Sequence, residues 1–174
     1  MRNSIIDQIH KEMKNNKNIF FLTADMGINL VEKIEKDFPN RFLNVGIAEQ
    51  NLIGVASGLI NIGFKVVAYT ISNFIVHRCL EQLRNDISLH KKPILLIGTS
   101  CGYDNSPLGP THHIVDDWGY IKNLPEFNIF CPSNLNFCDN LFNKLINQKK
   151  SIYLRIPKGK FSLVYGKEDY EYLS

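Results

Sequence analysis

The sequence has few cysteines, little net charge and no long apolar run, and each shortage excludes a class of protein. Its four cysteines, Cys79, Cys101, Cys131 and Cys138, lie far apart with no C-x-x-C pair, so neither a disulfide framework nor a zinc site is expected. A formal net charge of +3 gives no reason to expect nucleic acid or a membrane surface as a partner. No stretch is long enough to span a bilayer, and the N-terminal residues lack the apolar core of a secretory signal. We therefore predict a cytoplasmic protein with reduced thiols.

Apolar runs alternate with amphipathic stretches along the chain, which has 174 residues and an ordinary globular composition with 44% apolar residues. We predict six strands, at residues 19–23, 42–45, 65–69, 93–98, 128–131 and 151–155. We predict helices between them, one through residues 30–34 that ends near residue 39, and others at 48–61, 73–90, 114–124 and 135–148. Continuously apolar strands that are each followed by a helix indicate a parallel sheet covered on both faces. The predicted fold is an α/β three-layer sandwich with a mostly parallel six-stranded sheet.

Ligands of such sheets bind beyond the carboxyl ends of the strands, because right-handed crossovers bring those ends to one edge. The loops at this edge are predicted at residues 24–28, 46–50, 70–74 and 98–113. A single domain is predicted at residues 1–160. The segment at residues 161–174 has no evident place in the sheet, and we expect it to form a separate C-terminal tail.

Glu49 is the most informative polar residue, because it opens a predicted helix whose next turns are apolar or small. The simplest interpretation is a first-turn carboxylate that the helix dipole favours. The second interpretation is functional. Gly54 and Gly58 would let another backbone approach this helix closely, and the carboxylate would then lie at a buried helix end. The residues alone leave both interpretations open.

Several short runs, taken together, resemble the pyrimidine-binding domain of transketolases. They are Gly46-Ile47-Ala48-Glu49-Gln50-Asn51, Ala56-Ser57-Gly58-Leu59, Gly109-Pro110-Thr111-His112, the order Thr70, Phe74, Arg78, and, further on, Pro125 and Pro132-Ser133-Asn134. Each run alone is weak, but their order and separations agree with the family from about residue 20 to residue 155. The resemblance implies the pyrimidine-binding fold of thiamine-diphosphate enzymes, with the pyrimidine end of the cofactor held by this chain.

The resemblance implies a set of cofactor contacts. Glu49 matches the catalytic glutamate that hydrogen-bonds N1′ of the aminopyrimidine and exchanges a proton with it, which is acid–base catalysis relayed through the ring. Phe74 matches the aromatic residue that stacks on the aminopyrimidine. Asp25 matches an aspartate that lines the pocket, although a helix cap after the first strand is the simpler interpretation. Ile71 stands where many members have a second phenylalanine, so the aromatic part of the pocket is thinner here.

The resemblance also implies substrate contacts, and here the sequence departs from the family. His112 matches the catalytic histidine that contacts the reacting oxygen of the substrate, and Arg155 matches an arginine that contacts a phosphate. Ser100 stands in place of a histidine that helps to hold the sugar phosphate. Leu108 stands in place of an aspartate that hydrogen-bonds a sugar hydroxyl. Because loss of that hydrogen bond changes which substrate is accepted, we expect a specialised sugar pathway.

Arg78 has two possible places. It lies one helical turn beyond Phe74 in the predicted helix, so the two side chains share a face. Arg78 either points toward the site as a further substrate contact or pairs with Glu81 at the surface, and the sequence does not choose between them.

The chain has no Gly-Asp-Gly followed by a distant asparagine, the pattern with which this family binds Mg²⁺ and the diphosphate, and no metal ligand is predicted in it. The third transketolase domain is likewise not expected. The resemblance therefore implies a diphosphate-binding partner chain that holds Mg²⁺, with the active site between the two chains. We expect two copies of each chain in a heterotetramer, with self-association of this chain across a two-fold axis.

The predicted activity is transfer of a two-carbon ketol unit between small sugars by a two-chain, transketolase-like transferase. The run from Gly109 to His112 favours this activity over a decarboxylase or dehydrogenase subunit that acts on a 2-oxo acid. A non-catalytic regulatory domain of the same fold is a further alternative, but it would have no reason to keep a costly buried carboxylate at Glu49. An unassigned α/β nucleotide binder would need a glycine-rich phosphate loop after its first strand, which this sequence does not have.

Overall fold

The computed structural model describes residues 1–132 and 141–159. Their strands form one six-stranded sheet in the order β2-β1-β3-β4-β6-β5, and every neighbouring pair is parallel. The strands are β1 (Ile19–Thr23), β2 (Phe42–Asn44), β3 (Lys65–Ile71), β4 (Ile94–Thr99), β5 (Phe127–Phe130) and β6 (Ser151–Ile156). The predicted α/β fold with six strands is confirmed, and the sheet is parallel throughout.

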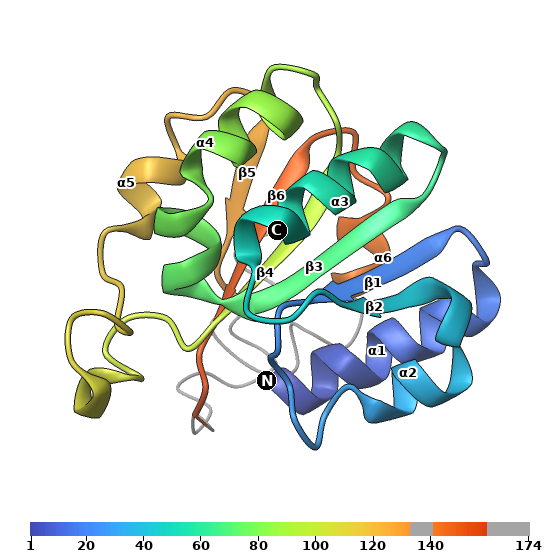
Figure 1. The fold of residues 1–174 in the computed structure, drawn as a ribbon, viewed down its shortest axis with the longest axis horizontal. Helices are drawn as coiled ribbons and strands as arrows, with labels where there is room; N and C mark the ends of the chain where they lie inside the picture. The colour runs from blue at the N-terminus through green and yellow to red at the C-terminus, as the bar shows by residue number, and fades with distance from the viewer. Residues whose placement is uncertain (133–140, 160–174) are drawn as a thin grey trace, which may run out of the picture.

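Helices cover both faces of this sheet (Figure 1). They are α1 (Arg2–Asn15), α2 (Glu32–Asp37), α3 (Glu49–Asn61), α4 (Leu80–Gln82), α5 (Asp117–Ile121) and α6 (Leu141–Ile146). Two π-helical segments, η2 (Phe74–Arg78) and η3 (Leu83–Ser88), flank α4. Two short 3₁₀ turns are η1 (Pro39–Arg41) and η4 (Ser106–Leu108).

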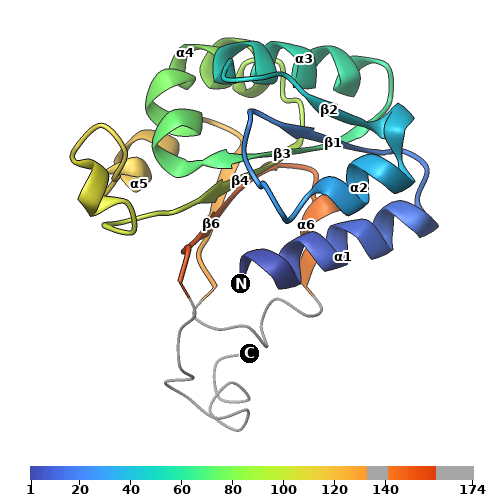
Figure 2. The same ribbon diagram turned by 60° about the horizontal axis from the view of Figure 1, so that its bottom comes forward.

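Three layers are evident when the sheet is seen from its edge (Figure 2). One apolar core lies between the sheet and α1, α2 and α6, and the other lies between the sheet and α3, η2, η3 and α5. Neighbouring residues of one strand serve opposite cores, as Phe21 and Leu22 do in β1. This two-sided burial is the reason why the strands read as continuous apolar runs rather than as alternating ones.

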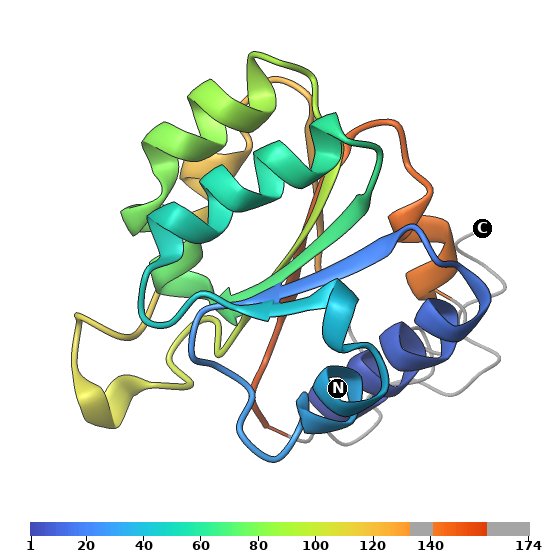
Figure 3. The same ribbon diagram turned by 45° about the vertical axis from the view of Figure 1, so that its right-hand side comes forward.

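The N-terminal helix α1 is an element that the sequence analysis did not predict. Its apolar residues Ile5, Ile9 and Met13 recur once per helical turn and are fully buried, in the core that α1 shares with α6 (Figure 3). Arg41 holds the end of this helix, because its guanidinium donates to the carbonyl oxygens of Met13 (2.8 Å) and Asn16 (2.9 Å). The spacing of these apolar residues is that of a helix, but the many polar residues between them make the pattern weak.

Two of the predicted helices differ from the structure in detail. The helix predicted at 73–90 exists, but π-helical turns at η2 and η3 interrupt it. The sequence did not predict these turns, because apolar periodicity does not distinguish i→i+4 from i→i+5 hydrogen bonding. The helix predicted at 114–124 is shorter in the structure, where only α5 (Asp117–Ile121) is helical and residues 114–116 belong to the preceding loop. Part of the helix predicted at 135–148, Cys138 and the tail at 161–174 lie outside the described residues.

Candidate active site

The loops after β1 and β2 are tied together at the carboxyl edge of the sheet by Asn44. Its Oδ1 accepts hydrogen bonds from the backbone N–H of Asp25 (2.9 Å) and of Gly46 (3.0 Å). Gly46 has a φ of 74°, a left-handed conformation that glycine adopts without steric cost. The chain turns at this glycine and enters α3, so that Glu49 becomes the first helical residue.

Glu49 is buried, with an exposed fraction of 2%, and its carboxylate forms an ion pair with the guanidinium of Arg78. The pairing of Arg78 with Glu81 that the sequence left open is therefore not what the structure shows. The neighbouring Gln50 donates from Nε2 to the backbone oxygen of Arg78 (3.0 Å), which ties the start of α3 to the end of η2. A charge removed from water in this way needs a partner, and Arg78 supplies it.

Phe74 lies between Arg78 and His112. The guanidinium carbon of Arg78 is 4.3 Å from the centroid of the Phe74 ring, a cation–π distance. The His112 ring meets Phe74 edge to face, with centroids 5.2 Å apart and an angle of 69° between the planes. Glu49, Arg78, Phe74 and His112 thus form one continuous group, which brings together three separate segments of the sequence.

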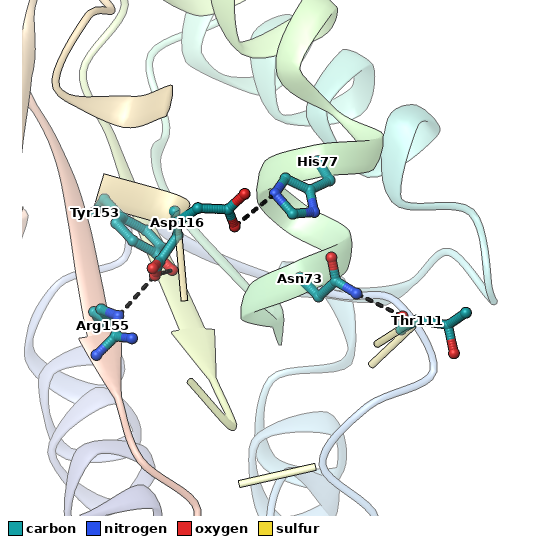
Figure 4. Close-up of polar contacts among 7 residues, drawn as sticks. Asn73, His77, Thr111, Asp116, Tyr153 and Arg155 are labelled. Atoms are coloured by element: carbon teal, nitrogen blue, oxygen red, sulfur yellow. Dashed lines mark hydrogen bonds and ion pairs between the residues drawn. The ribbon is translucent and has the colours of Figure 1, made fainter. Parts of the chain in front are cut away.

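The loop that carries His112 is fixed by a residue that the sequence analysis did not single out. Asn73, which precedes η2 and is buried, donates from Nδ2 to the backbone oxygen of Thr111 (2.5 Å; Figure 4). The Thr111 hydroxyl in turn lies 2.9 Å from Nδ1 of His112. The available signal for this role was an asparagine within the segment 70–74 that the sequence predicts at the binding edge.

A second polar group lies where β4 and β6 end (Figure 4). Asp117, fully buried at the start of α5, accepts from the Tyr153 hydroxyl (2.8 Å) and from Nε of Arg155 (2.7 Å). Burial opposes the charge of Arg155, but the hydrogen bond and the charge of Asp117 outweigh it and raise the pKa of the guanidinium. Burial, followed by the charge of Asp117, raises the pKa of Tyr153 well above its usual value. The sequence predicted Arg155 but neither Asp117 nor Tyr153, because nothing in the pattern of residues joins these three positions.

Gly98 in β4 is required by this second group. A Cβ at Gly98 would lie 2.7 Å from Cε2 of Tyr153 and 2.7 Å from the hydroxyl oxygen of Ser72. The absence of a side chain at Gly98 therefore lets the Tyr153 ring lie against β4, with its hydroxyl beside Asp117. Arg155 is paired with Gly98 in the sheet register.

The other four predicted site residues take no part in the contacts around Glu49 and Phe74. Ser100 is buried directly after β4 with a φ of 59°, and Ile71 is half-buried at the end of β3. Leu108 is 61% exposed in η4. Asp25 is exposed, and it does not cap α2, which begins at Glu32. All four lie in the loops or strand ends where the sequence placed the binding edge.

Three further observations concern the thiol of Cys79, metal ligands and helix length. Burial, followed by the charge of Glu49, raises the pKa of Cys79 to about 12, so this thiol is a poor nucleophile at neutral pH. No group of three potential metal ligands occurs within residues 1–132 and 141–159. In the same residues, no helix has the length and apolar character needed to cross a bilayer.

Comparison with known proteins shows what this chain is similar to. The family described as transketolase, pyrimidine binding domain, matches residues 1–162. A subunit of the apulose-4-phosphate transketolase of Actinobacillus succinogenes is 30% identical over 174 residues, which make up 99% of this chain and 56% of that protein. The 1-deoxy-D-xylulose-5-phosphate synthase 1 of Geobacter sulfurreducens is 33% identical over 158 residues, which make up 88% of this chain and 24% of that protein.

A solved structure described as a split gene transketolase, in an inactive β4 tetramer, matches with a TM-score of 0.83 and 28% identity. The match covers 95% of this chain and 53% of that one. The chain therefore spans about half the length of this structure and of the apulose-4-phosphate transketolase relative.

Proposed function

The chain belongs to the transketolase pyrimidine-binding family, and from this premise we propose that it is the pyrimidine-binding subunit of a two-chain, thiamine-diphosphate-dependent transferase. The proposed reaction moves a two-carbon ketol unit between sugars. The observation that carries the proposal is the buried Glu49 carboxylate, which Arg78 joins to the face of the Phe74 ring. Location in the cytoplasm stays a prediction from the sequence.

The residues present fit the aminopyrimidine end of the cofactor. A buried carboxylate and an aromatic face together suit a planar group that has both an N–H donor and a π system. The guanidinium of Arg78 is such a planar group, and it touches both the carboxylate and the ring in this structure. Glu49 would hold N1′ and Phe74 would stack on the ring, with Ile71 and Asp25 at the margins of the pocket.

Glu49 is the residue through which the chain would act on the cofactor. Bound thiamine diphosphate supplies an electron sink for the bond that is broken next to the carbonyl of the donor sugar. The carboxyl group of Glu49 would exchange a proton with N1′, and its burial keeps bulk water from competing for that proton. An amide at this position could keep the shape but could not exchange the proton.

His112 and Arg155 would contact the substrate. The contact with Phe74 and the hydrogen bond from Asn73 to the neighbouring carbonyl hold the His112 ring at the edge of the pocket, where it can exchange a hydrogen bond with a substrate oxygen. Arg155, oriented by Asp117, would bind an anionic group, with Ser100 directly after the adjacent strand β4. Exposed Leu108 offers no polar group to a sugar hydroxyl, and Arg78 is a further candidate for an anion contact.

The partner is proposed from the relatives. One relative is named as a subunit of a transketolase, and a related structure is described as a split gene transketolase. We expect a second chain that holds the diphosphate and Mg²⁺, and a heterotetramer built from two copies of each. Co-purification through a tag on this chain, followed by mass measurement of the intact complex, tests this assembly, and a complex without a second kind of chain would contradict it.

A donor screen with the assembled complex separates the proposed activity from its enzymatic alternative. Ketol transfer moves two carbons from a ketose phosphate to an aldehyde acceptor without release of CO₂. An enzyme that acts on a 2-oxo acid releases one CO₂ per turnover. We expect acceptor-dependent consumption of the ketose with no CO₂. Turnover of a 2-oxo acid with stoichiometric CO₂ would replace the proposal, and binding of the cofactor with turnover of neither donor would favour the regulatory alternative.

A further inference from the structure

Arg78 makes the two contacts that the proposed function gives to the aminopyrimidine. Its guanidinium pairs with the buried carboxylate of Glu49 and lies over the face of Phe74, 4.3 Å from the ring centroid. A guanidinium is planar and carries N–H donors in its plane, so it matches the carboxylate and the aromatic face as a nitrogen heterocycle would. Two planar groups cannot both occupy the space between Glu49 and Phe74.

The ion pair also occupies the group through which Glu49 would act. A ring nitrogen that exchanges a proton with Glu49 needs direct contact with its carboxylate, and in this structure the guanidinium of Arg78 makes that contact. Arg78 and the ring nitrogen would therefore compete for the same buried carboxylate.

The structure allows this movement without unfolding. The Arg78 side chain is 41% exposed, whereas that of Glu49 is 2% exposed, so only Arg78 can move into solvent. The backbone of Arg78 is held independently, because Gln50 donates to its carbonyl oxygen at 3.0 Å. Rotation of the side chain would leave that hydrogen bond intact.

We propose that Arg78 is a positioning residue that takes the place of the aminopyrimidine between Glu49 and Phe74 and is displaced when the cofactor binds. The inference rests on the proposed function. While Arg78 is in place, the buried carboxylate keeps a partner and does not face a desolvated pocket alone. The consequence is a weaker apparent affinity for the cofactor, because only the fraction of molecules with Arg78 turned away can bind it.

The first test asks whether the pair exists in solution and needs no cofactor. Urea unfolding of the full chain is measured for the wild type, R78M, E49Q and the double variant at neutral pH. R78M should lower the unfolding midpoint clearly in the wild-type background, since it leaves a buried charge unpaired, and much less in the E49Q background. The exposed Arg84 of η3 provides the matched control R84M. Equal effects of R78M in both backgrounds would show that Arg78 and Glu49 are not coupled and would overturn the inference.

The second test measures the equilibrium binding of thiamine diphosphate, with Mg²⁺, to the assembled complex by calorimetry. R78M should bind the cofactor about tenfold more tightly than the wild type if Arg78 occupies the site most of the time, and R84M should bind it as the wild type does. Unchanged or weaker binding by R78M would mean that Arg78 does not compete with the cofactor, and would overturn the inference while leaving the proposed function intact. No binding by the wild-type complex would instead overturn the proposed function, and with it the part of the inference that concerns the cofactor.

Discussion

At the scale of single residues, two buried carboxylates at the same edge of the sheet are held in different ways. Glu49 and Asp117 are both almost completely buried, and each has an arginine as its partner. The partner of Glu49 is 41% exposed, whereas that of Asp117 is 16% exposed and Asp117 is also bound to Tyr153. An exposed, movable partner such as Arg78 is compatible with the proton exchange proposed for Glu49. A more buried partner such as Arg155 is compatible with an orienting role for Asp117.

Replacement of Asp117 should therefore impair the binding of an anionic substrate rather than the chemistry. D117N keeps the size of the side chain but removes the charge that holds Arg155, and hydrogen bonds to charged groups contribute about 1.5–3 kcal/mol. We expect KM for a phosphorylated donor to rise by about tenfold or more, with kcat little changed. Steady-state kinetics with the assembled complex measures this, and an equal loss for an unphosphorylated donor would show that Asp117 acts on structure alone.

Gly98 offers a residue-scale test of the packing under Arg155. A methyl group in G98A would lie within 2.7 Å of Tyr153 and Ser72, and overpacking of this kind costs about 1–3 kcal/mol. The matched control is G58A in α3, where a Cβ would meet nothing within 4 Å, and where alanine should stabilise the helix by about 0.5–1 kcal/mol. Urea unfolding of the free chain compares the two. Stability of G98A equal to that of the wild type would contradict the close contact.

At the scale of elements, the sequence predicted the strands well and the helices less well. Each strand was found within about two residues, because burial on both faces makes a strand a compact apolar run between polar loops. Helix α1 was missed because its buried residues are separated by charged ones. The π-helical turns η2 and η3 were not predicted, since the spacing of apolar residues is too similar in α- and π-helical turns to tell them apart.

The candidate site was also predicted only in part. Glu49, Phe74 and His112 were assigned from short runs that resemble a family, and the structure brings them into one group. That structural grouping does not test their roles, which stay predictions. Asn73, Asp117 and the pairing of Arg78 with Glu49 depend on segments about 29 to 38 residues apart in sequence, and single-sequence patterns carry no signal for such contacts.

A contact between α1 and α2 makes the stability of the fold depend on pH. His10 of α1 lies 2.7 Å from Asp37 of α2, and this hydrogen bond, more than any other interaction, lowers the pKa of Asp37. A carboxyl group with a lowered pKa in the folded state stabilises the fold above its unfolded pKa, and that contribution is lost as the pH falls through the folded pKa. We expect D37N to be less stable than the wild type at neutral pH, and the difference to shrink in acid.

Thermal unfolding of D37N and the wild type across a pH series measures this difference. The exposed Asp7 of α1 provides the control D7N. A difference between D37N and the wild type that does not change with pH would show that Asp37 contributes by packing and not by its charge.

At the scale of the whole molecule, our proposal makes the chain one half of an active site. One edge of the sheet gathers a buried carboxylate, an aromatic ring, a histidine and an arginine that is held by Asp117. The pyrimidine end of a cofactor matches these groups, and its diphosphate end is assigned by our proposal to a partner chain. The account therefore predicts that cofactor chemistry appears only in the assembled complex and depends on a residue of this chain.

The exchange of the C2 proton of bound thiamine diphosphate with deuterium tests this claim most directly. In the assembled complex, E49Q should slow the exchange by about 10²–10⁴-fold, the usual contribution of a positioned acid–base group. The control E35Q, at an exposed position in α2, should exchange as the wild type does, and both variants should assemble normally. Exchange at the wild-type rate in a correctly assembled E49Q complex would contradict the account.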